Sequence, residues 1–240
     1  MRRSNRKAVP THMPMSTMTS SLYPLMTWLS PSFPVGAYSF SHGLENAVET
    51  GLITDTETAM NWIRDLLTVG DGHADLVFLA HAWEAGDDEA ALREVHELAL
   101  AFQPSEEIRL ESTAQGNSFL KTIANTWPCD VVATLQRIAG NAVVYPVALG
   151  AVARAHNVYR DTTLEAYGHA FIANLVSAAV RLVPLGQTDG QRITASLQAS
   201  VSSEATRAAA TPLHLVSSSC LMADITSMRH EVQYTRLFRS

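Results

Sequence analysis

Serine, histidine and glutamate occur together in the stretch SFSHGLE, residues 39–45, and this grouping raises the possibility of nucleophilic catalysis. A serine hydrolase, however, needs its nucleophile on a strained turn and a base that the fold brings in from elsewhere, whereas here Ser41 directly precedes His42. The chain also has no G-x-S-x-G motif. A cap explains these serines better, with Ser39 or Ser41 accepting a hydrogen bond at the start of a helix over residues 42–50. We therefore predict no catalytic residue in this stretch.

Metal binding is the second chemistry to consider, because the chain contains nine histidines. None of them stands in an H-E-x-x-H motif, and none pairs with a cysteine at the spacing of a zinc site. A surface or hydrogen-bonded role explains a single histidine more simply than ligation does. One alternative stays open, a direct metal carrier or an enzyme whose ligands or bases come from His42, Glu45, His230 and Glu231.

Nucleotide and nucleic-acid binding find no support in the sequence. Gly36 is not followed by G-K-[ST], and no G-x-G-x-x-G follows a predicted strand, so the common phosphate-binding loops are absent. The net charge is −6, and no basic stripe runs along any segment. We therefore expect partners other than DNA or RNA.

The cysteines and the apolar segments indicate where the protein works. Cys129 and Cys220 are 91 residues apart without a C-x-x-C motif, which favours reduced thiols in a reducing compartment. The basic N-terminal residues are not followed by the apolar segment of a secretory signal. No apolar run reaches the roughly 18–20 residues that a membrane-spanning helix needs. We expect a cytoplasmic protein that does not contact membranes.

Helices must position these residues, because helical periodicity dominates the sequence from residue 22 onward. Apolar side chains recur three and four positions apart in successive segments that glycine and proline separate. Ser105 marks one helix start, and two pairs that match a capping box mark others: Thr54 with Glu57, and Thr162 with Glu165.

The fold prediction follows from this pattern. Two valine-rich pieces, residues 130–132 and 143–145, are too short to be convincing strands. The hydrophobic fraction of 47% over 240 residues is enough for a large core. We predict an all-α protein with one globular domain of about nine to ten helices over residues 22–240, preceded by a disordered leader over residues 1–21.

Two further segments are unusual. Residues 182–192, LVPLGQTDGQR, read as a connection between helices, although their polar side chains could instead line a groove or a dimer interface. Residues 222–240 end the chain with arginines interleaved with Tyr234, Leu237 and Phe238. Chain ends are usually polar and frayed, whereas aromatic residues and arginine are enriched in protein interfaces. We interpret residues 222–240 as a docking tail.

Three segments together resemble one family, the UreF urease accessory proteins: LSPSFPVGAYSFSHGLE at 29–45, RLVPLGQTDGQR at 181–192 and SMRHEVQYTRLFRS at 227–240. ESTAQGNSFL at 111–120 and YPVALG at 145–150 fit the same pattern. The resemblance spans residues 22–240. It implies a cytoplasmic homodimer with no catalytic activity, no catalytic or metal-binding residues of its own and no tightly bound cofactor.

The resemblance also implies partners. Such a protein bridges an accessory protein of the UreD or UreH type and the GTPase UreG, in a complex that delivers nickel to the urease apoprotein. Within that complex it acts as a GTPase-activating partner or as a fidelity checkpoint. The candidate partner-binding residues are Pro34, Gly36, Tyr38, Ser41, His42, Gly43, Glu45, Arg229, His230, Glu231, Arg236, Leu237, Phe238 and Arg239. The candidates for a groove or the dimer interface are Gln187, Asp189, Gly190, Gln191 and Arg192.

One contact is expected between the two candidate segments. Tyr38 offers both a hydroxyl and an aromatic ring, and either can bind an arginine. We predict that Tyr38 contacts Arg236, so that the two ends of the domain form one surface that faces the GTPase.

Overall fold

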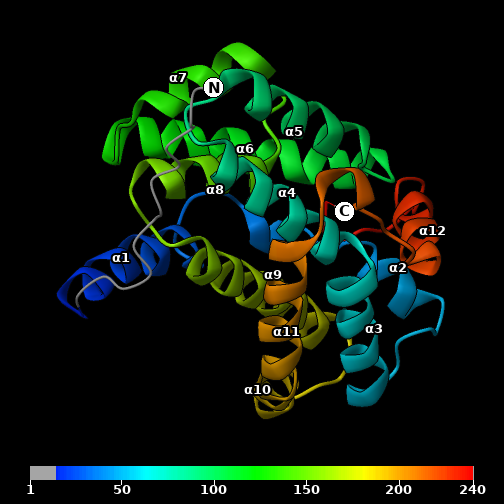
Figure 1. Ribbon diagram of the computed structural model, residues 1–240. Coiled ribbons are helices and arrows are strands. Elements are labelled where there is room, and N and C mark those ends of the chain that lie inside the picture. Colours follow the sequence, from blue (N-terminus) through cyan, green and yellow to red (C-terminus); the bar gives the residue numbers. More distant parts are fainter. Residues whose placement is uncertain (1–14, 240) are drawn as a thin grey trace, which may run out of the picture.

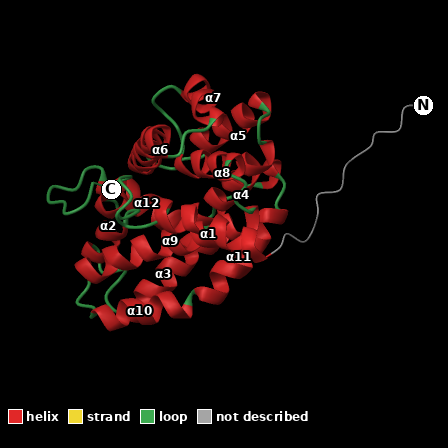
Figure 2. Ribbon diagram, turned by 90° about the vertical axis from the view of Figure 1, so that its left-hand side faces the viewer, coloured by secondary structure: helices red, strands yellow, loops and turns green. Residues whose placement is uncertain are grey.

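The computed structural model describes residues 15–239, and in that part of the chain every regular element is a helix (Figures 1 and 2). Twelve α-helices and two short 3-10 helices occur there. The α-helices are α1 (Met15–Trp28), α2 (Leu44–Glu49), α3 (Thr56–Val69), α4 (Asp71–Ala85), α5 (Glu89–Ala101), α6 (Glu106–Thr126), α7 (Asp130–Ala139), α8 (Tyr145–Ala155), α9 (Arg160–Leu182), α10 (Gln187–Ser196), α11 (Gln198–Ala210) and α12 (Leu221–His230). The 3-10 helices are η1 (Ala37–Ser39) and η2 (Leu213–Leu215).

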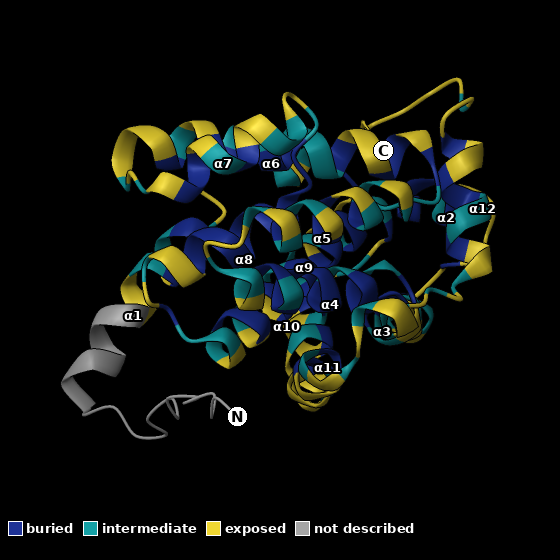
Figure 3. Ribbon diagram, turned by 45° about the horizontal axis from the view of Figure 1, so that its top comes forward, coloured by how far each residue is buried: buried dark blue, intermediate teal, exposed yellow. Residues whose placement is uncertain are grey.

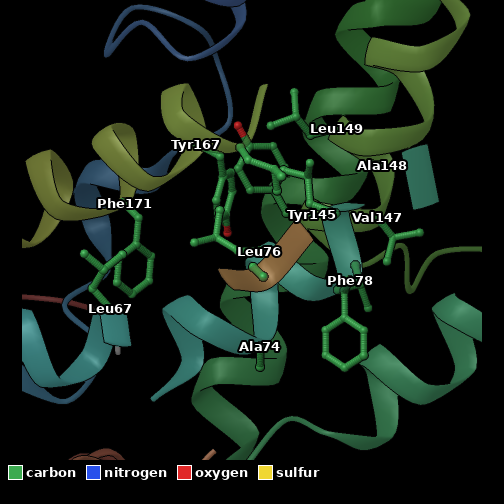
Figure 4. Close-up of a cluster of buried hydrophobic side chains, with 14 of the residues drawn as sticks. Leu67, Ala74, Leu76, Phe78, Tyr145, Val147, Ala148, Leu149, Tyr167 and Phe171 are labelled. Carbon is green, nitrogen blue, oxygen red and sulfur yellow. The ribbon is translucent and has the colours of Figure 1, made fainter. Parts of the chain in front are cut away.

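Helices α4 and α8 form the centre of the core. The first nine residues of α8, from Tyr145 to Ala153, are all buried, as expected for a helix that is apolar on every side. Gly150 lets α8 approach α4 closely, because a Cβ atom there would lie 2.4 Å from the carbonyl oxygen of Leu79. Side chains from α9 complete the packing, with Tyr167 and Phe171 beside residues of α4 and α8 (Figure 4).

Burial decreases outward from this centre. The helices around α4 and α8 turn buried faces inward and exposed faces outward (Figure 3). Helices α2 and α12 pack against each other at one end of the molecule, although about 170 residues separate them in sequence. No helix in the described part of the chain is long and apolar enough to cross a membrane.

The all-α prediction is confirmed for residues 15–239, but several details were wrong. Ser105 caps α6 as predicted, since its hydroxyl accepts a hydrogen bond from the Ile108 amide at 3.2 Å. The capping box of α3 joins Asp55 and Thr58, one position beyond the predicted pair. Helix α9 begins at Arg160, before the predicted box at 162–165. The valine-rich pieces lie where α7 and α8 begin.

The leader over residues 1–21 stays a prediction. Helix α1 is described from Met15 onward. Residues 1–14 lie outside the described residues. The predicted number of helices was too low, and the segment that begins α10 was interpreted as a connection between helices.

Candidate functional site

Two distant segments meet at the end of the molecule that α2 and α12 form. These are the proline loop (residues 31–45) and the C-terminal tail (residues 222–240). The amide of Arg239 donates a hydrogen bond to the carbonyl oxygen of Ser39 at 2.8 Å. The guanidinium of Arg181, on α9, donates to the carbonyl oxygen of Tyr38 at 2.9 Å and covers the ring of Phe238 at 4.3 Å. The sequence prediction that these segments belong to one surface is consistent with this geometry.

A buried imidazole fixes the tail. We call Glu45, Glu107, His230 and Arg236 the His230 cluster. His230 is fully buried, with Nδ1 2.8 Å from Oε2 of Glu107 and Nε2 3.0 Å from Oε2 of Glu45. Each ring nitrogen thus has a carboxylate partner, one from α2 and one from α6. His230 therefore bridges α2 and α6 from the end of α12.

The last residues of the tail bind the same carboxylates. The amides of Leu237 and Phe238 donate to Oε1 and Oε2 of Glu45 at 2.7 Å and 2.9 Å. The Arg236 guanidinium donates to Oε1 of Glu107 at 3.1 Å. Burial raises the pKa of Glu107, and the positive charges of His230 and Arg236 oppose that shift. The cluster thus compensates its buried charges within the protein.

Small residues let α12 approach closely enough for these bonds. Gly43 has a φ of +72°, and a Cβ atom there would lie 2.6 Å from the backbone nitrogen of Ser227. The hydroxyls of Ser105 and Ser227 are 2.6 Å apart. Glu231 accepts a hydrogen bond from the Glu106 amide at 3.0 Å. The start of α6 is therefore a docking point for α12.

The docked tail presents apolar side chains to the outside. Val232 is 86% exposed, Leu237 is 68% exposed and Tyr234 is fully exposed. Leu221, Met222 and Met228 on α12 are exposed as well. Large apolar residues gathered on one surface mark a binding site for another protein more often than scattered ones do.

A second, partly buried cluster surrounds His42. We call His42, Asp71, Asp75, Glu111 and Tyr167 the His42 cluster. Nδ1 of His42 lies 3.0 Å from Oε2 of Glu111, and the Tyr167 hydroxyl donates to Oδ2 of Asp75 at 2.6 Å. Asp71 and Asp75 are one turn apart on α4, so their carboxylates share a helix face.

Burial governs the protonation of this cluster. It raises the pKa of Asp71 to about 6 and that of Asp75 to about 7. Burial alone would lower the pKa of His42, but the nearby negative charges, Glu111 above all, raise it to about 9. The φ of His42 is +53°, in the left-handed region that histidine adopts uncommonly. The backbone is thus held in a strained form that turns the imidazole toward the acids.

The structure separates residues that the sequence grouped. His42 and Glu45 are three positions apart, yet they belong to different clusters. Arg236 donates to Glu107, and the bond found for Tyr38 in residues 15–239 is the one from Arg181 to its backbone carbonyl, so the contact between Tyr38 and Arg236 stays a prediction. No group of three or more His, Cys, Asp or Glu residues within residues 15–239 is placed to hold a metal ion.

The remaining predicted residues lie in or near the same surface. Ser41 accepts a hydrogen bond from the Glu45 amide at 3.4 Å, although Gly43 is the N-cap and α2 is shorter than predicted. Gly36 has a φ of +78° before η1, while Pro34 and Arg229 are exposed. Five residues of the two clusters were not predicted, because no local motif marks them: Asp71, Asp75, Glu107, Glu111 and Tyr167.

The segment at 187–192 forms the start of α10. Asp189 accepts hydrogen bonds from the Gly186 amide at 3.2 Å and from the Arg192 guanidinium at 2.7 Å, which explains both polar residues locally. Gly190 packs against α9, where a Cβ atom would lie 2.9 Å from Cγ2 of Val180. Gln187, Gly190 and Gln191 line a hollow beside α9.

Comparison with known proteins identifies relatives over most of the chain. A family model described as UreF matches residues 53–198. The chain is 50% identical over 224 residues to the urease accessory protein UreF of Rhodopseudomonas palustris strain BisB5, covering 92% of each protein. It is 47% identical over 223 residues to that of Bradyrhizobium diazoefficiens, again covering 92% of each. It is 44% identical over 218 residues to that of Methylorubrum populi, covering 90% of this chain and 97% of the relative.

Proposed function

This chain belongs to the UreF family of urease accessory proteins, and we propose that it is a non-catalytic adaptor whose docked tail binds another accessory protein. The observation that carries the proposal is the exposed apolar tail held in place by an ion cluster whose central imidazole is fully buried. Exposing Val232, Tyr234 and Leu237 to water does not stabilise an isolated chain. It does favour binding, because a tail that is already ordered loses less conformational entropy when a partner binds.

The partners we propose are those that the family resemblance implies. The tail surface would bind an accessory protein of the UreD or UreH type, and the proline loop with its neighbouring helices would bind the GTPase UreG. The resulting complex would deliver nickel to the urease apoprotein, with the nickel carried by the partners. A homodimer is part of the proposal, and the hollow that Gln187 and Gln191 help to line, together with Arg192 beside it, lies on a face that a second copy could cover.

We propose a cytoplasmic location as well. Cys129 and Cys220 are free thiols, as expected in a reducing compartment. Burial raises the pKa of Cys129, and it raises the pKa of Cys220 to about 11, so neither thiol is activated for chemistry.

The test is complex formation by a surface variant that leaves the clusters intact. Val232→Ser with Leu237→Ser removes two exposed apolar side chains but keeps the backbone amide that binds Glu45. Leu215→Ser, at a comparably exposed leucine in η2, is the matched control. We expect size-exclusion chromatography with light scattering to show the complex with a UreD-type protein for the wild type and the control, but not for the double variant. An unchanged complex in the double variant would contradict the proposal.

A further inference from the structure

A cavity of about 250 Å³ lies between the proline loop and the core. Its walls are largely aromatic and include Phe33, Tyr145, Tyr167 and Phe171. Tyr145 and Tyr167 lie side by side, with ring centroids 6.0 Å apart (Figure 4). The His42 cluster forms its polar end, while exposed residues of the proline loop, among them Pro31 and Tyr38, also line it. The cavity is therefore lined both by the candidate partner surface and by the carboxylates of the His42 cluster.

The carboxylates at the polar end differ in how fully they are paired. Glu111 pairs with His42 and accepts a hydrogen bond from Gln115 at 2.8 Å, and Asp75 accepts one from Tyr167. Asp71 makes no hydrogen bond or ion pair with any side chain of the described residues. Asp71 is only partly buried and lines the cavity, so its carboxylate is accessible to a group that enters.

The charge of the cavity selects the kind of ligand. Three carboxylates face one imidazolium, so the polar end carries a net negative charge once the acids ionise. A cation would relieve the burial that raises the pKa of Asp71. Aromatic faces favour a guanidinium or an ammonium group, and they also accommodate its aliphatic stem. A neutral apolar ligand would offer these carboxylates no partner.

We propose that this cavity receives an arginine or lysine side chain of a partner protein, inserted past the proline loop so that its cationic head lies beside Asp71. This inference rests on the proposed adaptor function, because the cavity is lined in part by the proline loop, which belongs to the candidate binding surface. It names the chemistry that the partner must bring to that surface. The tail surface offers apolar contact, and the cavity adds a charge-selective anchor.

The first experiment needs no partner. n-Butylguanidinium mimics an arginine side chain, and n-butylurea is its neutral analogue. We expect NMR titration to show guanidinium binding that is at least about tenfold tighter than urea binding, the scale of one charge-assisted hydrogen bond. Asp71→Asn should weaken guanidinium binding by about tenfold, whereas Asp87→Asn, a matched change at an exposed loop, should leave it unchanged. Equal binding of the two probes, or no effect of Asp71→Asn, would overturn the proposal.

The second experiment identifies the source of the cation. Complex formation with UreD-type and UreG proteins is measured for Asp71→Asn and Asp87→Asn, with the tail variant Val232→Ser/Leu237→Ser in parallel. We expect Asp71→Asn to weaken the complex with UreG about tenfold, because the proline loop lines the cavity, and to leave the complex with the UreD-type protein, which the tail binds, unchanged. If Asp71→Asn weakens probe binding but not the complex, a partner side chain is not the occupant and the proposal is wrong. Failure of the adaptor function itself would appear differently, as no complex even for the wild type.

Discussion

The His230 cluster and the His42 cluster are built from the same chemistry, one buried imidazole among carboxylates, but they differ in how many of their polar atoms are satisfied. Around His230, both ring nitrogens bind carboxylates, and backbone amides and Arg236 bind the remaining carboxylate oxygens. Around His42, one imidazole faces three carboxylates, one of which has no side-chain donor among residues 15–239. The first cluster is complete within the chain, and the second is not.

This difference separates a structural role from a binding role. A fully satisfied ion cluster holds two elements in one arrangement, and here it fixes a tail whose sequence alone would suggest a frayed end. An incompletely satisfied cluster beside a cavity destabilises the free protein and is retained where binding completes it. The two clusters contain the same residue types, but they differ in how many of their polar atoms have a hydrogen-bond partner.

The largest effect is expected from removing the imidazole of the complete cluster. His230→Ala leaves Glu45 and Glu107 buried without their shared cation, and breaking a buried pair in this way costs about 3–5 kcal/mol. We expect the free energy of unfolding in urea to fall by about that amount. His214→Ala, at an exposed histidine in η2, is the control and should change stability by less than about 0.5 kcal/mol. A His230→Ala protein as stable as the wild type would show that the cluster does not hold the tail.

A second variant tests whether the close approach of α12 to α2 matters as much as the charges. Gly43→Ala places a Cβ atom 2.6 Å from the backbone of Ser227, whereas Gly36→Ala meets no atom within 4 Å. Both positions have positive φ, so both substitutions carry the same backbone penalty of about 1 kcal/mol. We expect Gly43→Ala to be less stable than Gly36→Ala by about 2 kcal/mol in the same unfolding assay, and to bind the UreD-type partner more weakly. Equal stability of the two variants would mean that α12 moves away freely.

The sequence allowed the complete cluster to be anticipated better than the incomplete one. Glu45, His230 and Arg236 lie in segments with unusual composition and a family resemblance, so they were identified as site residues. The fold class followed from periodicity, and the Ser105 cap from its position before two glutamates. Asp71, Asp75 and Glu111 come from helices whose relative placement only tertiary packing determines, and no local pattern brings them to His42. The α3 capping box lies one residue later than predicted, because the Thr58 side chain takes the role expected of a glutamate.

The incomplete cluster should respond in the opposite direction to the complete one when a charge is removed. Asp71→Asn eliminates a carboxylate whose pKa burial raises to about 6, so ionising it at pH 7 opposes folding. Loss of a favourable charge at the N-terminus of α4 offsets part of this gain. We expect the variant to be more stable than the wild type by about 1 kcal/mol in thermal or urea unfolding at pH 7. A loss of stability instead would mean that Asp71 has a partner in the free protein and that the two clusters are alike.

The smallest expected effect is the pH dependence of the stability that Asp71→Asn gains. It tests the difference between the two clusters most directly. The groups that face Asp71 are His42, Asp75, Glu111 and Asp224, and Tyr167 reaches it through Asp75. An acid whose pKa rises on folding binds more protons in the folded state, so its contribution to stability falls as pH increases through about 4 to 6. His42 stays protonated over this range, because its pKa is raised to about 9. The advantage of Asp71→Asn over the wild type should therefore be larger at pH 8 than at pH 5, by roughly 0.5 kcal/mol after allowance for solvent screening.

Urea unfolding at both pH values measures this difference in stability, with Asp87→Asn as the reference for a general change in net charge. An equal gain in stability at both pH values would show that burial does not oppose ionisation of the Asp71 carboxylate. The distinction between a complete and an incomplete cluster would then fail.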